Sequence, residues 1–222
     1  MKKLAFLLSM SAVLVGCKTD IIAPITTDDL ESSEHKIVSG NVLVEVLTCN
    51  DYDDSRIESR SLVEAKSKVG SILKESEYIE CYDKQMKSYA SFKIPIGVGA
   101  VGDDGNLSFD SDVFVFSSKD IYLGAVLNPY LLQRMEQDKK RSFFSDKIDL
   151  NMSISLKVGN KPIPNVSWQS VYLSSKALNV GKIPIISETL TGDGIEDLII
   201  TISDVASESL MSGSPIVIGK RP

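Results

Sequence analysis

Histidine is almost absent from this sequence, which has one, His35, among 222 residues. A Ser-His-Asp or Cys-His site needs its imidazole within hydrogen-bond reach of the nucleophile. His35 lies in an N-terminal segment that we expect to be a tether, so the body of the chain cannot assemble such a site. The two cysteines of the body, Cys49 and Cys81, and this single histidine do not make a zinc cluster either. The sequence therefore argues against histidine-dependent catalysis and against a metal or other cofactor of that kind.

Basic residues are also in deficit. Lysine and arginine total 24 against 30 aspartates and glutamates, and loss of residues 1–16 with their two lysines would take the net charge from −6 to −8. Nucleic acids and anionic lipid surfaces attract basic patches, so this balance argues against both as partners. A phosphate-binding loop is missing too, because Gly97, Gly99 and Gly102 lack the following helix and lysine.

Long apolar runs are missing beyond the N-terminus, where residues 4–15 form one that follows two lysines and precedes Gly16. A membrane-spanning helix needs roughly 17–25 apolar residues, so this run is too short to span. A positive start, a short apolar stretch and a small residue are the pattern of a secretory signal. We therefore predict that residues 1–16 are a signal peptide. An ordinary signal cleaved nearby, with Cys17 a plain thiol, is the alternative.

The end of that segment, Leu14-Val15-Gly16-Cys17, resembles the lipobox of bacterial lipoproteins. The resemblance implies that Cys17 becomes the N-terminus, carrying a diacylglycerol on sulfur and an acyl chain on its amine. Several acyl chains on one residue anchor a protein stably to a membrane. Lys18 stands where an aspartate would imply retention at the inner membrane, so the resemblance implies delivery to the outer membrane. The body also resembles lipoproteins of unknown function carried on enterobacterial prophages.

Two cysteines, Cys49 and Cys81, are left in the body of the chain. In an oxidising compartment an even pair predicts a disulfide. The alternative is two buried thiols, since free cysteine often behaves as a small apolar core residue.

The fold class that the pattern indicates is α+β. Residues 17–40 are rich in polar residues and contain Pro24, which suggests a lipidated cysteine followed by a flexible tether, although the isoleucines at 21, 22 and 25 could instead form an edge strand. Residues 41–158 form an α+β domain, and residues 159–222 are expected as a β-rich extension or a small second domain.

The α+β domain is expected to begin with a strand–helix–strand unit. Residues 41–49 and 77–82 have strand character, and Ser61 with Glu64 matches a capping box that opens a helix over 61–75. A helical crossover makes its two strands parallel, and we expect them to be adjacent and joined by the disulfide. The order of elements up to residue 158 could be a ferredoxin-like unit with an inserted hairpin.

Further along the chain, strands are expected at 88–101, 112–117, 120–126 and 147–158, with a helix opened by Asn128-Pro129. Pro95 predicts an edge or a bulge, because proline cannot donate to a ladder. Residues 166–173, 183–190, 197–203 and 215–219 complete a series of short strands. The only tryptophan, Trp168, is expected in the core, with a carbohydrate-stacking surface as the alternative.

One segment, residues 191–200, looks like the calcium loop of FG-GAP propeller repeats. Asp193 and Asp197 match ligand positions of that loop, and calcium asks only for clustered oxygen ligands. Thr189 and Thr191 stand where earlier Asp or Asn ligands would be, and the repeat occurs once. Asp193 and Asp197 are therefore weak calcium candidates beside a simpler interpretation, an acidic turn between two strands.

Taken together, these features predict a non-enzymatic, lipid-anchored protein of the outer membrane that acts by binding another envelope protein. A phage- or plasmid-encoded lipoprotein that blocks a surface receptor is one alternative. A tethered hydrolase that uses a pair of carboxylates is the other, because any two acids could meet in the fold.

Overall fold

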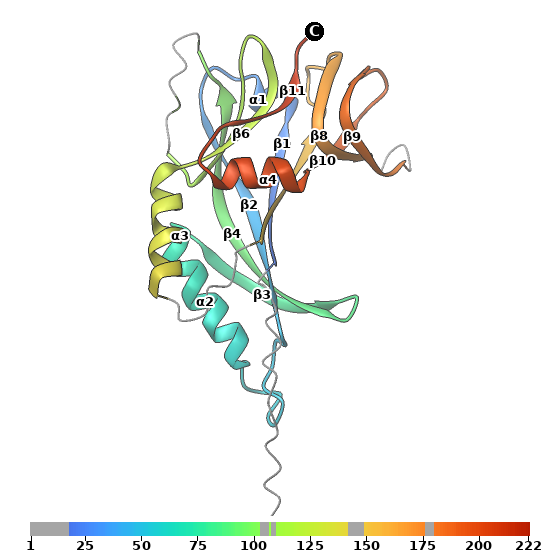
Figure 1. The fold of residues 1–222 in the computed structure, drawn as a ribbon. Coiled ribbons are helices and arrows are strands. Elements are labelled where there is room, and N and C mark those ends of the chain that lie inside the picture. Colours follow the sequence, from blue (N-terminus) through green and yellow to red (C-terminus); the bar gives the residue numbers. More distant parts are fainter. Residues whose placement is uncertain (1–17, 103–106, 108–109, 142–148, 176–179) are drawn as a thin grey trace, which may run out of the picture.

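The computed structural model describes residues 18–102, 107, 110–141, 149–175 and 180–222 (Figure 1). The strands are β1 (Lys18–Thr26), β2 (Lys36–Val46), β3 (Glu77–Lys84), β4 (Lys87–Ala100), β5 (Val113–Ser117), β6 (Ile121–Leu127), β7 (Asp149–Lys157), β8 (Val166–Ser175), β9 (Val180–Leu190), β10 (Asp197–Ile202) and β11 (Ile216–Lys220). The helices are α1 (Thr27–Leu30), α2 (Arg60–Ile72), α3 (Pro129–Arg141) and α4 (Asp204–Met211). The structure is a sheet-rich α+β protein, with 52% strand and 19% helix.

All the strands belong to one sheet, in the order β10-β7-β1-β2-β4-β5-β6-β11-β8-β9, with β3 on β4. One edge of β8 pairs with β11 near Trp168 and with β10 over residues 171–174, so the sheet closes on itself. Ser170 lies between these two stretches with a positive φ of 53°. Its carbonyl accepts a hydrogen bond of 2.9 Å from Ser203 N, just after β10. The kink at Ser170 thus allows one edge of β8 to pair with β11 before the kink and with β10 after it.

The inside of the closed sheet holds the main core. In β1, β2 and β7 alternate residues are buried, as the period-two pattern of a strand with one wet face requires. Trp168 is 2% exposed and packs edge-to-face on Tyr122, with ring centroids 6.3 Å apart. The predicted core position of the tryptophan is therefore confirmed.

Two short helices, α1 and α4, contribute to this core. Leu210 of α4 is fully buried, and α4 contacts four strands from different parts of the closed sheet, β6, β7, β8 and β11. Leu30 of α1 is also fully buried, and its carbonyl accepts a hydrogen bond of 2.7 Å from Ser117 in β5. Beside it, the carboxylate of Asp28 accepts the backbone N–H groups of Asn160 and Lys161, which lowers the pKa of Asp28.

The segment that we expected to be a flexible tether is instead a central part of the sheet. β1 pairs antiparallel with β2 and parallel with β7, so it is not the edge strand of the alternative either. The side chains of Ile21, Ala23 and Ile25 are buried on its inner face. The residues between them, Ile22 and Pro24, are apolar too, so the sequence shows an apolar run over residues 21–25 and no alternation with polar residues. Because β1 lies inside the sheet, burial of its apolar face outweighs its polar composition.

The strand–helix–strand unit is present with one difference from the prediction. β2 and β3 both run antiparallel to β4, so they are parallel to each other, but β4 lies between them and they are not adjacent. A complete ferredoxin-like unit is not formed either, because β1 separates β7 from β2. The N-cap of α2 is Ser59, whose hydroxyl accepts a hydrogen bond of 3.1 Å from Leu62 N, so the capping box at Ser61 is wrong by two residues.

Pro95 lies in a central strand, where the sequence led us to expect an edge or bulge. Along one side, β4 pairs continuously with β2. On its other side the last partner from β3 faces Lys93 and the first from β5 faces Ile96. Pro95 falls in this gap between two partner strands, where a missing N–H group costs no ladder hydrogen bond.

The later elements follow the sequence pattern. β5 and β6 form the expected hairpin, and Asn128 caps α3 by accepting a hydrogen bond of 3.0 Å from Tyr130 N. Of the strands after residue 159, β10 pairs with β7 and β11 with β6, and β8 pairs with both β10 and β11, so they complete the same closed sheet. None of the helices among the described residues combines the length and apolar character needed to cross a membrane.

Candidate functional site

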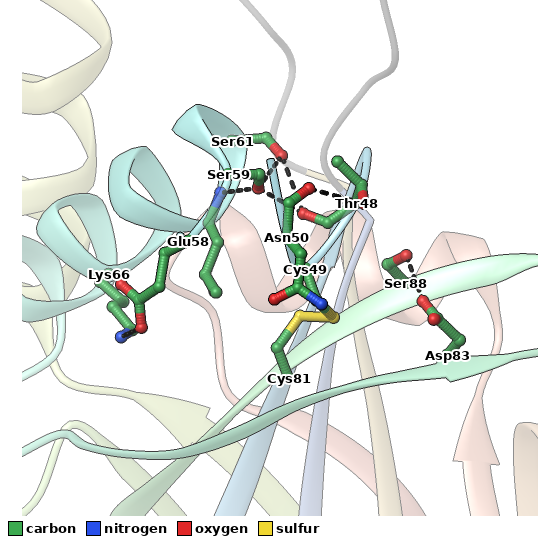
Figure 2. The surroundings of a disulfide bond; sticks show 11 residues. Thr48, Cys49, Asn50, Glu58, Ser59, Ser61, Lys66, Cys81, Asp83 and Ser88 are labelled. Carbon is green, nitrogen blue, oxygen red and sulfur yellow. Dashed lines mark hydrogen bonds and ion pairs between the residues drawn. A yellow bond between two sulfur atoms is a disulfide. The ribbon is translucent and has the colours of Figure 1, made fainter. Parts of the chain in front are cut away.

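The best-defined local site is the corner around the disulfide between Cys49 and Cys81, whose Cα atoms are 5.6 Å apart (Figure 2). Cys49 follows the end of β2 and Cys81 lies in β3. Because β4 separates these strands, the chain after β2 must fold across β4 to reach Cys81. The bridge therefore joins the loop before α2 to the outer strand of this part of the sheet, rather than joining two neighbouring strands.

Hydrogen bonds hold the loop that carries Cys49. Ser59 N donates to the carbonyl of Cys49 at 3.0 Å, and the Ser59 and Ser61 hydroxyls donate to the carbonyl of Thr48. Asn50 and Glu58 form an isolated bridge that closes the loop, and Lys66 of α2 forms an ion pair with Glu58. The loop is thus fixed at both its ends, by the disulfide and by the first turns of α2 (Figure 2).

This corner belongs to an end of the molecule that we call the disulfide end, formed by Lys18, residues 47–58 and residues 84–87. The strand register brings these parts together, because Thr19 pairs with Val44 and Val46 pairs with Ser88. Figure 1 shows the loop before α2 at the bottom of the view and the turn between β3 and β4 projecting to the right above it. Four large apolar side chains here are exposed, Ile57 by 56% and, more strongly, Leu47 by 71%, Tyr52 by 99% and Met86 by 104%.

The edge of β9 is a second candidate surface, and Figure 1 shows it far from the disulfide end. Among the described residues, β8 is the only strand that pairs with β9. Ile185 faces the core, whereas Ile183 is 47% and Ile186 88% exposed. An unpaired edge with exposed apolar side chains can accept an extended segment from another chain. Lys182 and Pro184 restrict such pairing over the first half of the strand.

A surface hollow of about 370 Å³ lies over a small apolar cluster that includes Phe114 and Phe116. Val101, Leu107, Phe116 and Ile121 contribute apolar lining, and Lys119 and Asp120 are the charged residues beside them. The volume is at the low end of the range for ligand pockets, and the mixed charge does not select a ligand class.

The structure places the two calcium candidates at the start of β10 and in the turn before it. Asp197 begins β10 and its carboxylate accepts a hydrogen bond of 2.9 Å from the Ser175 hydroxyl. Asp193 lies in the turn before it, with Gly194 at a positive φ of 73°. Within the described ranges there is no group of three His, Cys, Asp or Glu side chains that could hold a metal ion.

His35 does not lie in a tether but packs against the sheet between α1 and β2. Its Nε2 is 3.2 Å from the carbonyl of Ala100, and its ring meets Phe114 edge-to-face with centroids 5.0 Å apart. Both contacts are structural and neither involves a nucleophile. Cys17, the predicted lipidation site, lies outside the described residues.

The sequence predicts the pairing of Cys49 with Cys81, but it does not predict the two candidate surfaces, the disulfide end and the edge of β9. The exposure of Leu47, Tyr52 and Met86 depends on where loops end, which the apolar pattern does not encode. The β9 edge follows from how the sheet closes, and that depends on the kink at Ser170.

The chain matches the family described as a domain of unknown function (DUF7424) over residues 19–218 and belongs to that family. This match covers nearly the whole closed sheet, from β1 to β11. No curated protein and no solved structure matches the chain.

Proposed function

We propose that this protein is a lipid-anchored component of a bacterial outer membrane that acts by binding another envelope protein. The signal pattern before Cys17 supports the anchor. The Cys49–Cys81 disulfide supports an oxidising compartment, because such bonds persist outside the cytosol. The signal pattern and the disulfide bear on the anchor and the compartment, and they say nothing about which protein is bound.

The observation that carries the binding function is the free edge of β9. The strands from β10 through β8 close on themselves, and β3, the other edge strand, is tied by the Cys49–Cys81 disulfide to the loop before α2. β9 keeps one side of its backbone unpaired among the described residues and presents Ile183 and Ile186 to solvent. In strand addition the main chain supplies affinity and alternate side chains supply specificity. The partner on this account contributes an extended segment with apolar side chains.

The test is photo-crosslinking in cells that express the full-length protein. A photoreactive amino acid at Ile186 should capture one dominant envelope protein, which mass spectrometry identifies. The matched control places the same group at Val205 of α4, which is 70% exposed but lies on a helix. Ile186→Asp should abolish capture from a neighbouring crosslinker at Ile183, whereas Val205→Asp should leave it unchanged.

The outcomes separate the possible functions. If the captured protein is a surface receptor that phage use, the binding function would be receptor blocking. Expression of the protein should then change the sensitivity of the cells to phage. Equal adducts at Ile186 and Val205, or none at either position, would contradict the role of the β9 edge.

A further inference from the structure

The chain enters the sheet at once after the expected lipidation site. Residues 1–17 lie outside the described part, and Lys18, the next residue, already pairs with Asp149 of β7. Thr19 pairs with Val44, two residues before the end of β2. A chain anchored through Cys17 therefore has no spacer that could hold its body away from the lipid. With such an anchor, the start of β1, which belongs to the disulfide end, lies next to the lipid.

The disulfide end presents exposed apolar side chains among its polar residues. Leu47, Tyr52 and Met86 come from the loop before α2 and from the turn between β3 and β4, and all three extend into solvent. Tyrosine has an apolar ring and a polar hydroxyl, which suits the boundary between headgroups and acyl chains. Side chains of this kind around an anchor point fit the interface of a bilayer.

The turn between β3 and β4 gives an independent reason to regard Met86 as functional. Lys84 pairs with Lys87, so the turn has two residues, Gln85 and Met86, with φ of 51° and 62°. Such a turn favours Asn-Gly, because residues with larger side chains are strained at positive φ. The sequence thus accepts strain at two successive residues and places a fully exposed methionine at the tip. Strain of this kind is concentrated at functional sites.

The charges of the disulfide end indicate which type of lipid it would contact. Arg56 pairs with Asp54, Lys66 with Glu58 and Lys87 with Glu45. The remaining charges of the disulfide end, two lysines at positions 18 and 84 and two aspartates at positions 51 and 53, balance one another. A neutral surface with apolar tips fits zwitterionic phospholipid and has no electrostatic attraction to strongly anionic lipid.

We infer that the disulfide end rests directly on a zwitterionic phospholipid bilayer, with Leu47, Tyr52 and Met86 in its interfacial region. This inference rests on the lipid anchor of the proposed function. It fixes the orientation of the body, because the disulfide and the pairing of β1 hold the contact residues and the anchored chain in one rigid unit. The β9 edge then faces away from the membrane, where a partner can reach it.

The experiment uses the full-length protein, purified in its lipidated form with the lipid verified by intact mass. Cysteine variants Tyr52→Cys, Met86→Cys and Ile186→Cys each receive an environment-sensitive fluorophore. The native pair at 49 and 81 is oxidised, and the thiol of Cys17 carries the lipid, so only the new cysteine reacts. The labelled proteins are reconstituted into phosphatidylethanolamine–phosphatidylcholine vesicles that contain lipids with a quencher near the headgroup.

Fluorescence at positions 52 and 86 should shift to shorter wavelength and fall at least twofold with quencher lipid, whereas position 186 should be unaffected. An anchored protein that floats with the vesicles but shows no quenching at 52 and 86 overturns the inference and leaves the proposed anchor intact. A protein with no lipid in its mass spectrum overturns the anchor and this inference together.

Discussion

The carboxylate of Asp112 and the guanidinium of Arg134 form an ion pair that joins the start of β5 to α3, with the Asp112 side chain only 4% exposed. Asp112 also accepts a hydrogen bond of 2.7 Å from Lys74 N, and Arg134 Nε donates to the carbonyl of Ile72 at 2.6 Å. The pair therefore ties the end of α2 to α3 and to the sheet. Helices α2 and α3 keep their positions over the outer part of the sheet through these contacts.

Removal of the Arg134 guanidinium should leave the Asp112 carboxylate buried without its ion-pair partner. Arg134→Met is expected to lower the free energy of unfolding by about 3–5 kcal/mol, measured by urea denaturation. The control is Arg60→Met, which breaks an exposed i,i+4 pair with Glu64 and should cost less than about 0.5 kcal/mol. Similar losses for both variants would contradict the importance of the Asp112 pair.

The disulfide closes a loop with a sequence separation of 32 residues. In the chain-entropy model a loop of this size stabilises the native state by about 3–4 kcal/mol. Replacement of both cysteines by alanine should lower stability by that order, and reduction of the native protein should have the same effect. The double variant should be insensitive to reductant. If reductant destabilised the native protein and the double variant equally, the effect would not come from this bond.

Two glycines with different surroundings make a matched pair. A Cβ at Gly97 in β4 would lie 2.3 Å from Phe114 Cδ2 and 2.8 Å from Ser111 Oγ, whereas a Cβ at Gly70 in α2 would meet nothing within 4 Å. Gly97→Ala should destabilise by about 1–3 kcal/mol through overpacking. Gly70→Ala should stabilise by about 0.5–1 kcal/mol, because alanine loses less entropy in a helix. Thermal denaturation of the two variants measures both signs, and the same sign in both would refute the packing described at Gly97.

The turn at Gln85 and Met86 should become more stable when its residues suit its backbone. Replacement of the pair by Asn-Gly is expected to raise the free energy of unfolding by about 1–2 kcal/mol, since two strained positions are relieved. The same change removes the apolar tip, so the altered turn should lose contact with lipid while the protein gains stability. Urea denaturation gives the first result. No gain in stability would mean that the two residues are not strained.

The sequence predicts the parts of this fold that rest on local pattern. The α3 cap at Asn128, the β5–β6 hairpin and the burial of Trp168 all follow from residues close together in the chain. The pairing of Cys49 with Cys81 follows from their number and expected compartment. The route of that bridge across β4 does not, because it depends on which strand lies between β2 and β3.

Long-range features were harder to predict. The place of β1 depends on partners about 20 residues away in β2 and about 130 residues away in β7, and the local composition around Pro24 points to a loop. Pro95 gave a misleading signal for a similar reason, since the gap between β3 and β5 that accommodates it exists only in the assembled sheet. The candidate surfaces follow from this assembly as well.

The central claim is that this closed sheet is held at a membrane by lipid on Cys17, and the most direct measurement is the intact mass of protein extracted from membranes. We predict a chain that begins at Cys17 and carries the mass of a diacylglycerol and an acyl chain, and a Cys17→Ser variant that loses this mass and leaves the membrane fraction. A membrane-extracted chain without the added lipid mass, or a Cys17→Ser variant with unchanged mass and membrane partitioning, would contradict the account.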